Sequence, residues 1–351
     1  MQKYLYNLAT GEYRGLIPSI IKVFLFILSL IYGLVVRILI LFYRLNPSRL
    51  NCKVISVGNI TLGGTGKTSL VEYIAKYLKP QGHKVAILSR GYKRIVHSSK
   101  FIVQSYEAMG DEPYMLSKNL GDTPVIVDSD RIRATKEAIR DYRADTVILD
   151  DGFQQWKIKK DLEIVTIDAT NPFGNQYLIP RGILREPLTS LKRADIFILT
   201  KTNLHPDIRD IKDFLARLNP GALIFESIHK PMGFYKIDQP DKLLNGDILK
   251  DKTVTLFSGI ADPDSFENLI ISLGIKVGSS FRFPDHHNYS PDDLDKIVQA
   301  SKEKNIDTIV TTEKDATRLY ELRATSYELK VLVLRIKLEV KNEEGFNSRL
   351  L

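Results

Sequence analysis

The sequence contains little cysteine and no histidine cluster with the spacing of metal ligands. Cys52 is the one cysteine among 351 residues, so an intramolecular disulfide is excluded and a reducing compartment is the simplest interpretation. Six histidines, scattered apart from one adjacent pair, leave a zinc site without a suitable ligand set. The chain has no internal repeat, and its 44% hydrophobic and 26% charged residues are ordinary for a folded protein that divides into two lobes.

Acidic residues are nearly missing from the first 53 residues. Seven Lys or Arg stand there against the single acid Glu12, which gives a local charge of +6 and leaves +2 of the formal net charge of +8 for the remaining chain. A nucleic-acid partner would require a basic stripe across the folded body, and the sequence does not predict one. Basic charge confined to one apolar end indicates an anionic membrane surface instead.

An apolar run from Leu16 to Tyr43 lies in this basic region. Its uncharged part, residues 23–36, is bounded by Lys22 and Arg37 and is shorter than the roughly 20 residues that a membrane span needs. Large apolar residues follow Arg37 where a cleaved signal peptide would have small ones, so that interpretation is discounted. A membrane-lying or half-inserted helix pair is favoured, and a single span or a buried core helix are the alternatives.

Short β-rich runs alternate with amphipathic helical patterns from about residue 53 to residue 228. The expected strands are 54–57, 85–88, 125–127, 146–149, 164–167 and 196–199. Such alternation predicts a mostly parallel sheet with helices on both faces. A smaller α/β lobe is expected further on, with strands at 254–257, 279–283 and 308–311 and helices at 263–273 and 291–304. A final run, 329–340, could pair with 234–237 as a two-stranded bridge.

The most informative motif is T-L-G-G-T-G-K-T, residues 61–68, between a β-branched run and a helical pattern. A glycine-rich turn that opens a helix aims backbone N–H groups at one point, which suits a phosphate group. The usual pattern G-x-x-x-x-G-K-[ST] has glycine at the position of Thr61, so this loop is deviant. An ordinary tight turn would explain the glycines but not Lys67 and Thr68, which are expected to reach the β- and γ-phosphates of ATP and to hold Mg²⁺. The residues expected to bind the nucleotide are Thr61, Gly63, Gly64, Thr65, Gly66, Lys67, Thr68 and Ser69.

The sequence contains two further pairs of adjacent carboxylates. Asp150 and Asp151 follow an apolar strand, and Asp111 and Glu112 precede a helical run. The first pair could simply begin a loop, but beside a phosphate loop a Mg²⁺ role for at least one acid is favoured. For the second pair, helix capping and an acid that accepts a proton from an attacking hydroxyl are equally good interpretations.

Three further clusters have plain structural alternatives. The adjacent histidines, His286 and His287, follow Asp285 in the second lobe, and they form either a turn or part of a site over which that lobe closes. Arg181 and Arg185 lie in a loop rich in glycine and proline, and Arg131 and Arg133 follow a strand. Guanidinium groups suit phosphate oxygens, although a solvated surface position is the commoner fate of arginine.

Together these segments resemble one family, the tetraacyldisaccharide 4′-kinases, which are membrane-associated kinases of lipid A assembly. The resemblance rests on eight segments in shared order: V-G-N-I-T-L-G-G-T-G-K-T from Val57, S-R-G-Y from Ser89, G-D-E-P from Gly110, L-D-D-G-F-Q from Leu149, R-G-I-L-R-E-P-L from Arg181, F-S-G-I from Phe257, F-P-D-H-H from Phe283 and T-T-E-K-D from Thr311. It implies transfer of the ATP γ-phosphate to the 4′-hydroxyl of a tetraacylated glucosamine disaccharide 1-phosphate, giving lipid IVA. The implied place is the cytoplasmic face of the bacterial inner membrane, with no obligatory protein partner.

The resemblance also implies roles for single residues. Asp111 is similar to the catalytic base of the family, with His286 from the closing lobe as its partner, beside Lys67 in the phosphate loop. Thr68, Glu112, Asp150 and Asp151 would serve Mg²⁺, and Arg131, Arg185 and Glu186 would position phosphates or the sugar. A membrane-associated P-loop switch or partitioning ATPase is the alternative, and it is disfavoured because Leu62 occupies the position at which those proteins have lysine.

The expected fold class is therefore α/β, with a P-loop NTPase-like, mostly parallel sheet, a smaller C-terminal α/β lobe and an N-terminal membrane-associated helical segment. The expected ranges are 1–50 for that segment, 51–229 for the P-loop kinase core, 230–246 for a connector, 247–328 for the smaller lobe and 329–351 for a return strand and tail.

Overall fold

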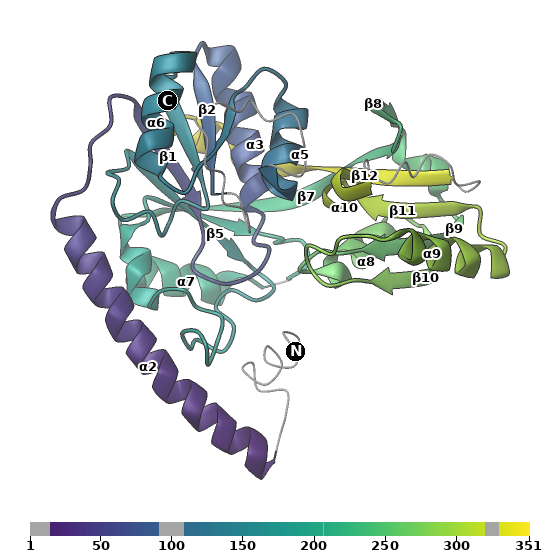
Figure 1. Ribbon diagram of the computed structural model, residues 1–351, viewed down its shortest axis with the longest axis horizontal. Helices are drawn as coiled ribbons and strands as arrows, with labels where there is room; N and C mark the ends of the chain where they lie inside the picture. Colours follow the sequence, from purple (N-terminus) through teal and green to yellow (C-terminus); the bar gives the residue numbers. More distant parts are fainter. Residues whose placement is uncertain (1–14, 91–108, 206, 320–329) are drawn as a thin grey trace. The chain divides into compact units, whose positions relative to one another are not determined.

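The computed structural model describes residues 15–90, 109–205, 207–319 and 330–351 (Figure 1). Gly91 and Tyr92 of the S-R-G-Y segment, Glu12 and Leu329 lie outside the described residues. The chain forms two compact units. Within the described residues, unit 1 contains 15–90, 123–228 and 340–351, and unit 2 contains 109–122, 229–319 and 330–339. The sequence predicts continuous ranges, whereas each unit is assembled from separate segments of the chain.

Unit 1 contains a parallel sheet in the order β7-β6-β5-β1-β4-β2-β3. The strands are β1 (Lys53–Gly58), β2 (Val85–Ser89), β3 (Val125–Val127), β4 (Thr146–Asp150), β5 (Leu162–Asp168), β6 (Ile196–Thr200) and the first part of β7 (Leu223–Lys236). β2, β4 and β6 are buried at every residue, so both of their faces are covered. Their runs of Val, Ile and Leu are typical of such strands.

The helices of unit 1 are α2 (Leu16–Leu45), α3 (Lys67–Leu78), α6 (Arg131–Tyr142), α7 (Arg209–Leu218) and α11 (Glu343–Asn347), with 3₁₀ turns η1 (Lys79–Gln81) and η2 (Leu188–Arg193). Among them, α3, α6 and α7 pack on the sheet. α6 packs through Ala134 and Ala138 in one buried cluster with β1, β2 and β4, while α3 also contacts these three strands. The predicted α/β class with helices on both faces is confirmed.

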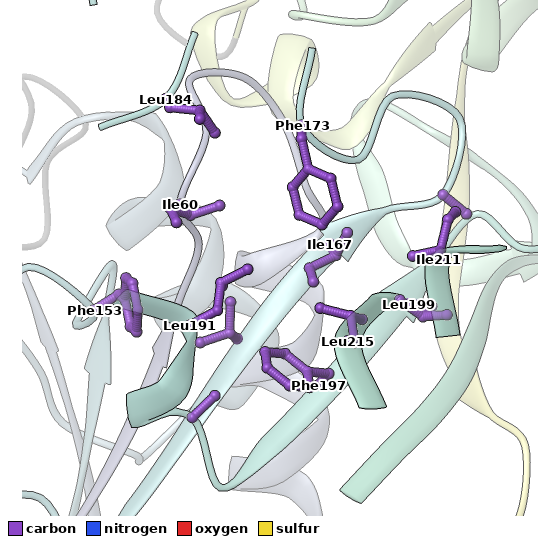
Figure 2. Packing of buried hydrophobic residues seen from close by; sticks show 13 residues of the cluster. Ile60, Phe153, Ile167, Phe173, Leu184, Leu191, Phe197, Leu199, Ile211 and Leu215 are labelled. Atoms are coloured by element: carbon purple, nitrogen blue, oxygen red, sulfur yellow. The ribbon is translucent and has the colours of Figure 1, made fainter. Parts of the chain in front are cut away.

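A second buried cluster connects the sheet of unit 1 to the loops around the phosphate-binding loop (Figure 2). Ile211 and Leu215 of α7 pack there with side chains of β5 and β6, and the same cluster includes Ile60, Phe153 and Leu184. Each fully buried apolar side chain of this size contributes roughly 1.5–3 kcal/mol. The loops that contain Ile60, Phe153 and Leu184 are therefore fixed by the core and not only by the ligand they are expected to bind.

Unit 2 has its own sheet in the order β10-β9-β11-β12-β7, with β8 paired antiparallel to β7. Its elements are β8 (Gln239–Leu244), β9 (Thr253–Ser258), β10 (Lys276–Arg282), β11 (Thr308–Thr312), β12 (Lys330–Val340), α5 (Asp111–Leu120), α8 (Pro263–Ser272), α9 (Pro291–Glu303), α10 (Glu313–Leu319) and η3 (Gly246–Leu249). One buried cluster includes α9 and α10 and another includes α8, each packed on β9, β11 and β12.

The interpretation of residues 230–246 as a connector is wrong. β7 continues to Lys236 and pairs with β8, and the Phe234 side chain is fully buried in the core of unit 2. The apolar residues of this segment outweigh its proline, glycine and aspartate content. β12 does lie beside β7, as predicted, but within a larger sheet and not as a two-stranded bridge.

The N-terminal apolar run forms one continuous helix of 30 residues, α2, so the favoured helix pair is wrong. By length and composition this helix could cross a membrane. Its few buried residues include Gly33, where an added Cβ would approach the Leu178 side chain to 2.6 Å. Beside this close approach, the Tyr32 hydroxyl donates to the carbonyl of Arg185 at 2.7 Å. Most of the large apolar side chains of α2 are exposed.

Candidate active site

The phosphate-binding loop leads directly into α3, which begins at Lys67. Gly66, the residue before it, has φ +78° in the left-handed region, which glycine adopts without steric cost. The first N–H groups of α3 have no partner within the helix, and with the helix dipole they favour an anion at this end. The predicted strand, turn and helix are confirmed.

Backbone hydrogen bonds to a neighbouring loop hold this turn in place. The Leu62 amide donates to the Ile183 carbonyl and the Arg185 amide donates to the Ile60 carbonyl, both at 2.8 Å. The turn also contacts the sheet, because the Thr65 hydroxyl lies 2.7 Å from the Thr166 hydroxyl of β5. Thr61 is not among the described residues with positive φ, so a β-branched residue is tolerated where the usual pattern has glycine.

The Lys67 ammonium is oriented by two side chains at the carboxyl ends of β1 and β4. It donates to Asn59 Oδ1 at 3.2 Å and lies 3.6 Å from Asp151 Oδ1. Arg185 donates to both oxygens of the same carboxylate, from Nη1 to Oδ2 at 2.8 Å and from Nη2 to Oδ1 at 2.7 Å. Its Nη2 also contacts Asn59 Oδ1. Two cations and one carboxylate therefore converge beside the phosphate-binding loop.

The charge state of Asp151 follows from these neighbours. Burial raises the pKa of the carboxyl, but the hydrogen bonds from Arg185 and the charges of Lys67, Arg185 and Arg131 outweigh burial and bring this pKa well below its usual range. Asp151 is therefore ionised at neutral pH, as a Mg²⁺ ligand must be.

Asp150 and Arg131 lie deeper in unit 1. Asp150 ends β4, and its Oδ2 lies 3.4 Å from the Ser89 hydroxyl. Arg131 donates Nη1 to the Asp128 carbonyl at 2.9 Å and Nη2 to the Asp150 carbonyl at 3.3 Å. Burial lowers the pKa of Arg131 to about 10, although the charges of Asp150 and Asp151 oppose the shift. Arg131 thus connects the backbone just after β3 with the end of β4, where Asp150 lies.

Glu186 is the most enclosed of the predicted site residues, with 0% of its side chain exposed. Its carboxylate accepts hydrogen bonds from Arg193 Nη1 at 2.8 Å, Trp156 Nε1 at 3.0 Å and Gln154 Nε2 at 3.1 Å. These donors are groups of the protein itself, so the contacts of Glu186 stabilise the loop in which it lies. Contact of Glu186 with a sugar or phosphate stays a prediction.

Asp111 and His286 are hydrogen-bonded in unit 2. Asp111 is the first residue of α5, and its Oδ2 lies 2.8 Å from His286 Nδ1. The resemblance implies that His286 comes from a different, closing lobe, but both residues belong to the same unit. The reason is that α5 packs against α10 of unit 2, which a sequence pattern does not reveal.

The predicted Mg²⁺ ligands are divided between the two units. Thr68, Asp150 and Asp151 lie in unit 1, whereas Glu112 lies in unit 2 and contacts Lys314 Nζ at 3.2 Å. Burial lowers the pKa of Lys314, but the charges of Glu112 and Asp285 outweigh burial and raise it. In the described part of the chain, no group of three or more His, Cys, Asp or Glu side chains could hold a metal ion without further ligands. Mg²⁺ commonly keeps water and substrate phosphates as its other ligands.

A family model described as tetraacyldisaccharide-1-P 4′-kinase matches residues 21–351. The chain belongs to this kinase family. The predicted phosphotransferase class is thereby confirmed, and the switch-ATPase alternative is not favoured. The family acts on a lipid disaccharide.

Relatives of the kinase family match along almost the whole chain. The tetraacyldisaccharide 4′-kinase of Halothermothrix orenii is 36% identical over 365 residues, covering 97% of this chain and 95% of the relative. That of Pelobacter propionicus is 33% identical, covering 98% and 95%. The crystal structure of LpxK from Aquifex aeolicus in complex with ATP has a TM-score of 0.75 and 30% identity, covering 94% of this chain and 99% of that one.

Sequence reasoning about this kinase misses Asn59, Lys314 and Arg318. Asn59 follows β1 within V-G-N-I, and Lys314 lies within T-T-E-K-D, so both stand in segments that the resemblance already marks. Arg318 follows Lys314 by one helical turn on α10, and only its contact with Asp111, 207 positions away, reveals it.

Proposed function

We propose that this chain transfers the γ-phosphate of ATP to the 4′-hydroxyl of a tetraacylated glucosamine disaccharide 1-phosphate, giving the 4′-phosphorylated lipid A precursor. Membership of the kinase family is the observation that carries this proposal. ATP with Mg²⁺ fits the chain, since a phosphate-binding loop, an oriented lysine and ionised carboxylate oxygens supply the groups that this donor requires.

Unit 1 is proposed to bind the nucleotide. The amides of residues 61–69 and the N-terminus of α3 would hold the phosphates, and Lys67 would neutralise the β- and γ-phosphates. Thr68, Asp150 and Asp151 would hold Mg²⁺, which when bound withdraws charge from the phosphate oxygens. Arg185 is the arginine we expect to meet a phosphate, because it lies against Asp151 and Asn59 beside the loop.

Unit 2 is proposed to supply the proton acceptor. The Asp111–His286 pair would take the proton of the attacking 4′-hydroxyl while its oxygen bonds to the γ-phosphorus and ADP leaves. A positioned acid–base group of this kind contributes about 10²- to 10⁴-fold in rate.

The N-terminal helix is proposed to hold the enzyme at the cytoplasmic face of the bacterial inner membrane, as a monotopic helix or a single span. Exposed side chains such as Leu30, Ile31 and Leu34 would contact lipid. Arg37 and Arg44 on the same helix suit anionic headgroups. The acyl chains of the acceptor could then remain in the bilayer, and no protein partner is required.

The test is transfer of label from γ-labelled ATP with Mg²⁺ to tetraacyl disaccharide 1-phosphate in mixed micelles. The matched control is the same lipid already phosphorylated at the 4′ position, which should take up no label. Labelling of the first lipid alone supports the proposal. ATP hydrolysis without labelled lipid, or equal labelling of both lipids, would contradict it.

A further inference from the structure

One side of α2 is fitted to the loop 171–187 of unit 1. The buried residues of the helix recur at helical spacing and are Ser29, Gly33 and Val36. An added Cβ at Gly33 would approach Leu178 Cδ1 to 2.6 Å. The ring of Phe26 packs edge-on against that of Tyr177, with centroids 5.7 Å apart. A helix that served only to attach the protein to a membrane would not require such close contact with this loop.

The helix also makes a directed hydrogen bond to the loop. The Tyr32 hydroxyl donates to the Arg185 carbonyl at 2.7 Å, across 153 positions of sequence. The acceptor is a backbone atom, so the bond depends on where the chain runs at residue 185 and not on the rotamer of that side chain. The bond is partly buried, and a hydrogen bond is stronger there than in water.

The backbone at residue 185 is joined to the phosphate-binding loop as well. The Arg185 amide donates to the Ile60 carbonyl, and the Leu62 amide donates to the Ile183 carbonyl, both at 2.8 Å. Leu184 and Ile60 belong to the same buried cluster (Figure 2). Because two hydrogen bonds and a shared core hold these segments together, a displacement at residue 185 would be passed to the turn that is proposed to bind the phosphates.

The Arg185 side chain completes this connection. Its guanidinium donates to the two oxygens of Asp151 at 2.8 and 2.7 Å. It also contacts Asn59 Oδ1, the atom to which Lys67 donates at 3.2 Å. The carbonyl, the amide and the side chain of residue 185 branch from one Cα, and its peptide units are planar and stiff. Fixing the carbonyl therefore limits where the amide and the guanidinium can lie.

We propose that Tyr32 is a positioning residue of the nucleotide site: its hydroxyl holds the backbone at Arg185, so that docking of α2 on the loop 171–187 sets the guanidinium and the phosphate-binding loop in place for ATP. The inference rests on the proposed function, in which Arg185 meets a phosphate. It gives the N-terminal helix a part in nucleotide binding in addition to membrane attachment.

The first test is the affinity of the full chain in detergent micelles for a non-hydrolysable ATP analogue with Mg²⁺, measured calorimetrically without lipid. Tyr32→Phe keeps the ring and removes the hydroxyl. Its affinity should fall by about 2- to 10-fold, the range that one lost hydrogen bond allows. In the labelling assay KM for ATP should rise and KM for the lipid should stay unchanged. Tyr43→Phe is the matched control on the same helix, because the Tyr43 ring lies against Lys157 instead, and it should bind like the wild type.

The second test uses Trp156, the one tryptophan of the chain. Its Nε1 donates to Glu186 Oε1 at 3.0 Å, one residue after Arg185, so its fluorescence reports on this loop. Emission without nucleotide should change in Tyr32→Phe and in Gly33→Leu, whose added side chain would force α2 away from Leu178. Both variants keep the apolar surface of α2 and should still float with vesicles.

The outcomes are decided by nucleotide binding. An affinity of Tyr32→Phe equal to that of the wild type would overturn the inference, whatever the emission of Trp156 shows. A raised KM for the lipid with unchanged affinity for the ATP analogue would overturn it too, because α2 would then act through the membrane alone. Failure of the proposed function is distinguishable, since the wild type would then label no lipid, whereas the binding assay contains no lipid.

Discussion

Replacing Lys67 with methionine should separate activity from stability. Methionine keeps an apolar stem of similar length and removes the ammonium. The residue loses a 3.2 Å hydrogen bond to Asn59 and a 3.6 Å ion pair with Asp151. Both partners retain Arg185, so neither is left without a cation. The substitution therefore removes one charge from the phosphate site and leaves the surrounding contacts in place.

The expected sizes of the two effects differ widely. The Lys67 side chain is 15% exposed and its ion pair is long, so the free energy of unfolding should change by less than about 1 kcal/mol. The lost cation is aimed at the position of the β- and γ-phosphates. Removing one preorganised group of this kind costs about 10²- to 10³-fold in kcat, or roughly 3–4 kcal/mol.

The assay is label transfer to lipid in mixed micelles, with urea unfolding followed in parallel. Lys76→Met is the matched control, because Lys76 lies on the same helix, is 56% exposed and pairs with Glu72. It should leave both quantities unchanged. Near-normal turnover in Lys67→Met would refute the assignment of the ATP site. A loss of more than about 3 kcal/mol in stability would instead show that Lys67 holds the fold.

Three further predictions concern charge pairs and the N-terminal helix. The pKa of Asp151 is depressed in the folded state, so its stabilising contribution is present above the unfolded value of about 3.9 and is lost as pH falls through the folded pKa. The difference in free energy of urea unfolding between wild type and Asp151→Asn should therefore shrink from pH 5 toward pH 2. A constant difference would contradict this. Glu186→Gln leaves the mostly buried Arg193 opposite a neutral amide and should lower the free energy of unfolding by about 3–5 kcal/mol. Glu339→Gln is the control, because its pair with Lys230 is exposed and its loss should cost less than about 1 kcal/mol. Equal costs would refute a structural role for Glu186. Deleting residues 1–45 leaves the Ser48–Ile158 bridge intact and should release the protein from vesicles in a flotation assay, and retained binding would place the anchor elsewhere.

Much of unit 1 is predictable because its information is local. Runs such as 146–149 are apolar and β-branched over a few residues, and they form strands buried on both faces at the expected positions. The turn at residues 61–68 likewise needs only its own glycines and the strand and helix beside it. These patterns depend on neighbouring residues, which a single sequence displays.

The remaining features depend on partners far away in the chain. Residues 109–122 lie between two strands of unit 1 in sequence, yet α5 packs against α10, and a short amphipathic helix does not encode its partner. Segment 230–246 has the composition of a loop, but the Phe234 side chain is buried in the core of unit 2. The apolar run 16–43 does not show by itself whether it forms one helix or two, and the lack of a side chain at Gly33 allows close packing against Leu178 within one helix.

The candidate site follows the same division. Asp111, His286, Asp151 and Lys67 stand in recognisable segments, and the structure gives each of them a charged or hydrogen-bonding partner. The sequence does not show that the Glu186 carboxylate is enclosed by Arg193 and Trp156, because those contacts depend on how the loop folds.

The most direct test of the account is a double-mutant cycle on Asp111 and His286, with kcat for lipid labelling measured in Asp111→Asn, His286→Ala and the double variant. Because the two side chains form one hydrogen-bonded pair, each single change should lower kcat by about 10²- to 10⁴-fold and the double change should lower it little further. His287→Ala is the control, since the His287 ring bonds to Asp293 instead. Losses that add in free energy would show that Asp111 and His286 act independently and would contradict a shared role in proton transfer.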